Sequence, residues 1–152
     1  MDKLVDYLVN PLVYLKRARS PGARRGSPMP VIRSNEATAH DVHGATFTAY
    51  ANSRTGTAEL CAWSTRLPAG QPGLPHRISR EEIFLVTGGA PRFTIDDETV
   101  DATLGDVVVA PASSLLGIEA LGDQDSTIWV TTSLGLTAKL PDGTEFAPPW
   151  AQ

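Results

Sequence analysis

From residue 45 onward, the sequence alternates between short β-prone runs and turn-forming residues. Val, Ile, Thr and aromatic residues concentrate in nine runs, at residues 45–51, 57–67, 82–86, 92–95, 99–102, 107–110, 115–121, 127–132 and 136–139. Turn formers such as Gly88-Gly89 and Asp142-Gly143 stand between these runs. No segment after Val31 has the three-turn amphipathic period of a helix. Because many short strands with regular turns are typical of a sandwich or barrel, the sequence predicts an all-β domain.

The first 28 residues differ in character from the rest of the chain. Residues 1–29 carry six Lys and Arg but only two Asp, and residues 20–28 are rich in Pro, Gly and Arg. Such a segment has little to bury in a core. We therefore expect residues 1–28 to be a basic, flexible N-terminal extension and residues 29–152 to form a single domain. The alternative is an address segment or a membrane-surface helix, although no long uninterrupted apolar run followed by a cleavage site is present.

The charge and cysteine content of the remaining chain exclude several functions. Residues 30–152 hold seven Lys and Arg against fifteen Asp and Glu, a balance that argues against nucleic acid binding. No apolar run approaches a membrane span, so we expect a cytoplasmic protein without a membrane partner. The single cysteine, Cys61, stands in an apolar predicted strand and cannot form an intrachain disulfide. We interpret it as a small buried hydrophobic residue.

Two segments with regular spacing carry the functional signal. In the first, Gly70 is followed by His76, Glu82 and Gly89; in the second, Gly105 is followed by Pro111. This spacing resembles that of the cupin superfamily, and most nearly the small single-domain cupins similar to quercetin dioxygenase. The resemblance covers roughly residues 45–136 and implies a double-stranded β-helix, the jelly-roll barrel.

The resemblance also shows what this chain lacks. A typical cupin gathers three His and one Glu around one metal, whereas here Ile78 stands at the second His and Leu116 at the third. Ser113 and Ala120 replace the later Gly and Asn of the second motif. Three protein ligands are the usual minimum for a catalytic zinc or non-heme iron site, and the motifs supply only His76 and Glu82. We therefore expect a degenerate metal site and no cofactor; if Fe, Mn or Zn is bound, His76 and Glu82 are its expected ligands.

His40 and His43 offer a route by which metal binding could be restored. They precede the first predicted strand and could fold over the barrel mouth. Two His residues in a polar segment are more often part of a surface loop, which is the interpretation we favour.

Alternation along a strand places certain side chains inside the barrel. His76 and residue 78 would point inward, and Glu82 on the next strand could meet them. Trp63, Ile78, Phe84, Leu116 and Ile118 are the expected ligand-binding wall, which would make the cavity apolar and partly aromatic. For Trp63, core packing is the competing interpretation.

Three functions fit these residues. The first is binding of a small, largely apolar organic molecule, with acid-base catalysis by His76 and Glu82 as in an isomerase, cyclase or dehydratase, the carboxylate fixing the imidazole tautomer. The second is a non-catalytic cupin that binds a ligand for sensing or carriage. The third is a metal-dependent dioxygenase or isomerase with an atypical site. We expect Trp150 in the proline-stiffened C-terminal tail to pack across the barrel, and the resemblance implies a homodimer.

Overall fold

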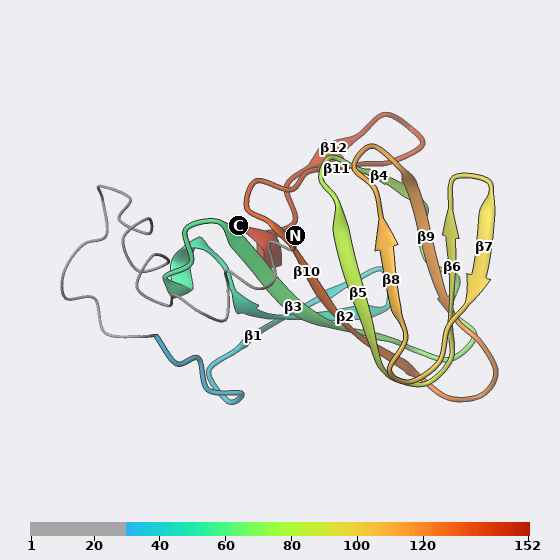
Figure 1. The fold of residues 1–152 in the computed structure, drawn as a ribbon, viewed down its shortest axis with the longest axis horizontal. Coiled ribbons are helices and arrows are strands. Elements are labelled where there is room, and N and C mark those ends of the chain that lie inside the picture. The colour runs from blue at the N-terminus through green and yellow to red at the C-terminus, as the bar shows by residue number, and fades with distance from the viewer. Residues whose placement is uncertain (1–29) are drawn as a thin grey trace, which may run out of the picture.

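The computed structural model describes residues 30–152, which form two six-stranded antiparallel sheets (Figure 1). The expected extension, residues 1–28, lies outside the described residues. The first sheet contains β1 (Thr38–Val42), β2 (Ala45–Ala51), β3 (Leu60–Leu67), β10 (Ser126–Ser133), β5 (Glu82–Gly88) and β8 (Val107–Ala110), in that spatial order. The second contains β12 (Glu145–Phe146), β11 (Ala138–Lys139), β4 (His76–Ile78), β9 (Leu115–Ala120), β6 (Pro91–Ile95) and β7 (Glu98–Asp101).

Neighbouring strands of each sheet come from distant parts of the chain. Strand β10 pairs with β3 on one side and with β5 on the other, and β4 pairs with β9. This interleaving, with the two sheets facing each other, is the arrangement of a jelly-roll barrel. The prediction of an all-β fold is confirmed: in the described part of the chain, the only helical segments are the short 3-10 turns η1 (Ser53–Thr55) and η2 (Pro149–Ala151). Within residues 30–152, no helix has the length and hydropathy required to span a membrane.

The core lies between the sheets and follows the two-residue period of the strands. Along β5, Glu82, Phe84 and Val86 are buried, whereas Ile83 and Leu85 face outward and are exposed. The rings of Phe84 in the first sheet and Phe93 in the second meet with centroids 5.3 Å apart. Cys61 is fully buried in β3, and burial raises the pKa of its thiol to about 11, so it remains an uncharged, inward-facing residue.

The structure differs from the expected strands mainly at their ends. Strand β3 begins at Leu60, three residues later than the run at 57–67 suggests. Local hydrogen bonds explain the later start. The side chain of Asn52 caps η1 by accepting a hydrogen bond from the backbone N–H of Arg54, and the backbone N–H of Thr57 donates to the carbonyl of Asn52. These bonds hold the chain in a turn up to that point. Strands β1, β4 and β12 were not among the nine expected runs. The sequences of β1 and β12 are more polar than those of the core strands, and β4 has only three residues.

Candidate functional site

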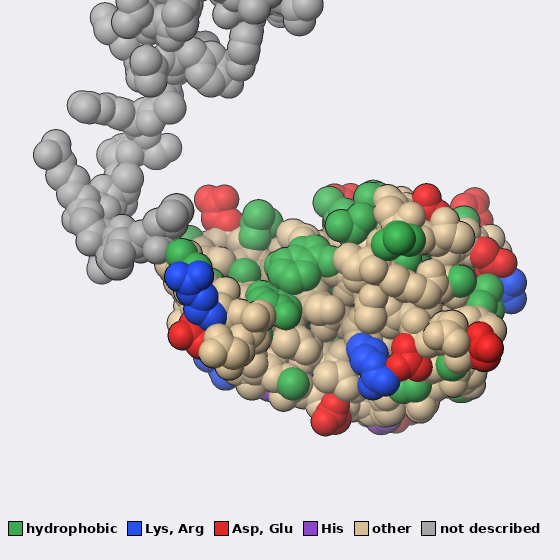
Figure 2. Space-filling view, turned by 90° about the horizontal axis from the view of Figure 1, so that it is seen from below, with side chains coloured by type: hydrophobic (Ala, Val, Ile, Leu, Met, Phe, Trp, Pro, Cys, Tyr) green, Lys and Arg blue, Asp and Glu red, His purple; other side chains and the backbone are tan. Residues whose placement is uncertain are grey.

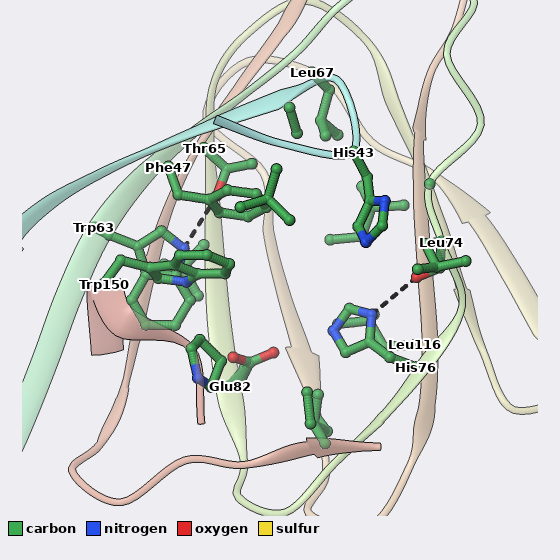
Figure 3. Close-up of a pocket in the computed structure, with 18 of the residues that line it drawn as sticks. His43, Phe47, Trp63, Thr65, Leu67, Leu74, His76, Glu82, Leu116 and Trp150 are labelled. Carbon is green, nitrogen blue, oxygen red and sulfur yellow. Dashed lines mark hydrogen bonds between the residues drawn. The ribbon is translucent and has the colours of Figure 1, made fainter. Parts of the chain in front are cut away.

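A cavity of about 130 Å³ lies between the two sheets and is lined by both of them. Strands β2, β3 and β5 form one wall, β4, β9 and β11 form the other, and the C-terminal segment around Trp150 closes one side (Figure 3). Most of the lining is hydrocarbon or aromatic. The cavity therefore has the character of a small-molecule site, in which a few polar groups lie among apolar walls.

Glu82 is the most deeply buried ionisable group of this cavity. It is the first residue of β5, its side chain faces inward, and it is only 3% exposed. Within the described residues, no hydrogen bond reaches its carboxyl group, which points into the cavity in Figure 3. Burial raises the pKa of Glu82 to about 8, because a carboxylate is poorly solvated there. At neutral pH, this group is therefore mainly a carboxylic acid, able to donate as well as accept a hydrogen bond.

His76 lies at the start of β4 and also lines the cavity. Its Nδ1 lies 2.9 Å from the carbonyl oxygen of Leu74. A carbonyl can only accept, so Nδ1 carries the proton and Nε2 of the neutral ring is an acceptor. Burial lowers the pKa of His76, against the smaller opposing effect of the bond to Leu74, so the ring is neutral at pH 7.

The relation between His76 and Glu82 differs in one respect from the sequence hypothesis. Both side chains line the same cavity, but no hydrogen bond joins them among residues 30–152. The tautomer of His76 is fixed by the carbonyl of Leu74 and not by Glu82. Figure 3 shows the second ring nitrogen of His76 on the cavity side, with Glu82 across the space from it. The two groups are thus available to a molecule lying between them.

Ile78 and Leu116 occupy the two positions where a metal-binding barrel of this type has imidazoles. Both are 1% exposed and line the cavity, and Leu116 is paired directly with His76 between β9 and β4. Their hydrocarbon side chains have no lone pairs to offer a metal. In the described part of the chain, no group of three His, Cys, Asp or Glu side chains is arranged to hold an ion. The residues present therefore do not fit a metal centre.

An aromatic surface forms the side of the cavity next to Glu82. The rings of Phe47 and Trp150 stack at a centroid distance of 3.9 Å with planes 8° apart. Trp63 lies beside them, and its indole N–H donates to Oγ1 of Thr65 at 3.1 Å, so this donor is already satisfied (Figure 3). Trp150 is 6% exposed, as expected for a tail that packs across the barrel. Flat rings pack well against such a surface.

The exposed mouth of the cavity is formed by the β1–β2 turn and the loop before β4. His43 and Gly44 make the two-residue turn, with φ values of 50° and 79°. Positive φ at both positions is what a tight hairpin of this kind requires, and it is unusual for a residue other than glycine. The Gln71 side-chain amide donates to the carbonyl of His43 at 2.9 Å and joins the turn to the loop. The ring of His43 lines the cavity near His76 in Figure 3.

The cavity wall expected from the sequence lies together in the structure. Trp63, Ile78, Phe84, Leu116 and Ile118 all line the cavity. Phe47, Trp150 and His43 also line it, and only the fold brings these three positions together. His40 does not line the cavity; its ring lies 6.1 Å from that of Trp150. Trp129 faces the other side of its sheet, where its ring is 5.2 Å from that of Tyr50.

Comparison with known proteins rests on solved structures. No model of a protein family matches the sequence, and no curated protein matches it significantly. A cupin from Shewanella frigidimarina, described as RmlC-like, is 18% identical, covers 66% of this chain and 86% of its own, and superposes with a TM-score of 0.58. The protein has the cupin fold. The fold of the barrel thus agrees with the cupin resemblance of the two glycine-containing motifs.

Two further solved structures have the same fold. KdgF from Halomonas sp. is 28% identical, with a TM-score of 0.58, and the match covers 67% of this chain and 92% of KdgF. The polyketide cyclase RemF from Streptomyces resistomycificus is 15% identical, with a TM-score of 0.63, and the match covers 70% of this chain and 80% of RemF. The match to RemF shows a common fold alone.

Proposed function

We propose that this cupin binds a small, largely apolar organic molecule in the cavity around His76 and Glu82. The observation that carries the proposal is the Glu82 carboxyl, which is 3% exposed, faces the cavity and has no hydrogen-bond partner among the described residues. Its oxygens are not among the enclosed side-chain atoms without a partner, which in the described residues are those of Thr57 and Ser126. The carboxyl borders the cavity instead, where a bound molecule can supply its hydrogen bond. The surrounding apolar wall provides the remaining binding energy through the hydrophobic effect.

Binding of para-xylene to the full chain tests this proposal. We expect saturable shifts of backbone amide resonances along β3, β4 and β5. Trp150→Ala should weaken binding at least tenfold because it removes one aromatic wall. Trp129→Ala is the matched control, since this tryptophan contacts Tyr50 outside the cavity. Absence of saturable binding, or equal weakening by both variants, would contradict the proposal.

Acid-base conversion of the bound molecule is the second candidate function. It is supported by two opposed groups that are both uncharged at neutral pH: Nε2 of His76 as an acceptor and Glu82 as a proton donor. With an aryl ketone, His76 would take a proton from the carbon next to the carbonyl while Glu82 gives its proton to the carbonyl oxygen, forming the enol. The reverse steps restore the ketone, so the reaction needs no external oxidant or cofactor.

Deuterium exchange into 4-methylacetophenone separates catalysis from binding alone. In D2O, an acid-base cupin should accelerate exchange at the methyl carbon next to the carbonyl. His76→Gln and Glu82→Gln should each reduce this acceleration by about 100-fold, within the range typical of general acid-base groups. His40→Gln, which changes a histidine outside the cavity, should leave it unaltered. Exchange at the background rate, with the ketone shown to be bound, would favour the non-catalytic sensing or carrier function.

A further inference from the structure

The walls of the cavity carry no positive side chain that could hold an anion. The lining contains neither Lys nor Arg, and its ionisable side chains are His43, His76 and Glu82. His43 is exposed at the mouth, whereas the other two lie deeper. Burial keeps Glu82 mainly protonated and His76 neutral at pH 7. A carboxylate or phosphate entering this space would lose its hydration without gaining a counter-charge, which is strongly unfavourable.

The two deep polar groups have unused hydrogen-bonding capacity. The Glu82 carboxylic acid has no partner among residues 30–152, and Nε2 of His76 is an acceptor because Nδ1 donates to Leu74. Figure 3 shows both groups facing the cavity interior. A hydroxyl group suits this pair, since it can accept from Glu82 and can donate to His76. A ligand with only hydrocarbon would leave both groups unpaired.

The size and shape of the cavity favour one aromatic ring. Its volume is about 130 Å³. An engineered protein cavity of about 150 Å³ with apolar walls is known to hold benzene. The stacked pair of Phe47 and Trp150, with Trp63 beside it, provides a flat surface against which such a ring can pack.

We infer that the ligand of this cavity is an uncharged, single-ring phenol, with its ring against the aromatic wall and its hydroxyl group at Glu82 and His76. This inference rests on the proposed binding function and adds the chemical class of the ligand. It also separates this cavity from sites for aromatic carboxylates, which need a cation that the lining lacks.

Three para-substituted probes of similar shape test the inference. Para-xylene, para-cresol and para-toluate differ only in the group opposite one methyl: a methyl, a hydroxyl or a carboxylate. Titration calorimetry of the full chain at pH 7 should show para-cresol binding at least tenfold more tightly than either other probe. Hydrophobicity alone would favour para-xylene, so a preference for para-cresol requires a polar partner in the cavity. Equal binding of cresol and xylene, or tighter binding of toluate, would overturn the inference while leaving the binding function intact. If none of the three binds, both are wrong.

Variants of Glu82 identify the partner of the hydroxyl. Glu82→Leu should bind para-xylene but lose most of the tenfold preference for para-cresol, because the carboxyl is replaced by hydrocarbon of similar size. Glu82→Met provides a second hydrocarbon replacement, and thermal unfolding shows that each variant is folded. The matched control is Glu81→Leu, which changes the neighbouring exposed carboxylate and should keep the full preference. Retention of the preference in both Glu82 variants would contradict the role of this carboxyl.

Discussion

At the scale of single residues, four positions define the chemistry of the site. His76 and Glu82 supply polar groups, while Ile78 and Leu116 fill with hydrocarbon the positions that a metal-binding cupin gives to imidazole. The resemblance to the cupin motifs predicted that all four lie on one cavity, and residue parity along a strand supported the inward direction of His76 and Ile78. It could not predict that Leu74 accepts the proton of Nδ1, since the backbone path of the loop decides that contact.

Restoring both imidazoles should create a metal site. The double variant Ile78→His and Leu116→His would place two additional nitrogen donors beside His76 and Glu82, giving the three or more ligands that zinc requires. Without metal, we expect the variant to be less stable by about 2–4 kcal/mol, because polar rings replace buried hydrocarbon. Zinc should then raise its melting temperature by several degrees, as binding to the folded state alone stabilises it.

Thermal unfolding with and without zinc measures this effect. The double variant Ile78→Asn and Leu116→Asn is the control, since it introduces similar polarity without ligands that bind zinc well. Wild-type protein should show no comparable shift. A folded His double variant that zinc does not stabilise would show that the four side chains cannot converge on one ion.

At the scale of elements, the sequence predicted the strands better than their closure into a cavity. The nine β-prone runs correspond to strands because β-branched and aromatic residues are concentrated in them, and apolar side chains such as Phe84 in β5 and Ile128 in β10 fill the core. The sequence predicted that the tail with Trp150 packs across the barrel, but not that its ring stacks on Phe47 to form a wall of the cavity. Phe47 and Trp150 are more than a hundred residues apart, and only tertiary packing brings their rings together. Local patterns contain no information about such contacts.

The β1–β2 turn should affect stability and ligand binding together. Gly44→Ala places a side chain at φ 79°, which costs about 1–2 kcal/mol. Its new Cβ would also overlap Nε2 of Gln71, so this side chain must leave the carbonyl of His43. We therefore expect lower stability and several-fold weaker binding of para-xylene, because the mouth of the cavity is loosened.

A second glycine separates backbone strain from the change at the mouth. Gly122 has a similar φ of 74°, and no atom would lie within 4 Å of an added Cβ. Gly122→Ala should show a comparable loss of stability in chemical denaturation but unchanged affinity for para-xylene. Equal affinities of the two variants would mean that the contact between Gln71 and His43 does not shape the mouth.

At the scale of the whole molecule, the surface carries acidic side chains (Figure 2), whereas the cavity inside the barrel is lined mainly by apolar ones. Figure 2 shows Asp and Glu around the margin of one face, with hydrophobic side chains gathered between them. These exposed carboxylates differ from Glu82, because solvent stabilises their charged form. The homodimer expected from the cupin resemblance stays a prediction. The pH dependence of folding, in contrast, can be derived from the buried groups.

Stability should fall as the pH rises from 6.5 to 8.5. The unfolded chain releases the Glu82 proton near pH 4.5, whereas the folded protein holds it to about pH 8, so unfolding releases a proton in this window. The lowered pKa of His76 acts in the opposite direction, but mainly below its ordinary value of 6.5. Above that pH, the effect of Glu82 remains, and linkage gives a loss of about 2 kcal/mol in the free energy of unfolding.

Urea denaturation of the full chain at pH 6.5, 7.5 and 8.5 measures this loss. Glu82→Gln should be nearly flat across the same range, because its side chain has no proton to release. Glu81→Gln, at the neighbouring exposed position, should follow the wild type. If Glu82→Gln lost as much stability as the wild type over this pH range, the carboxyl would already be ionised in the folded protein. The cavity would then be charged, and the basis for its selection of a neutral ligand would be wrong. The denaturation series therefore tests the electrostatic basis of the site without requiring any ligand.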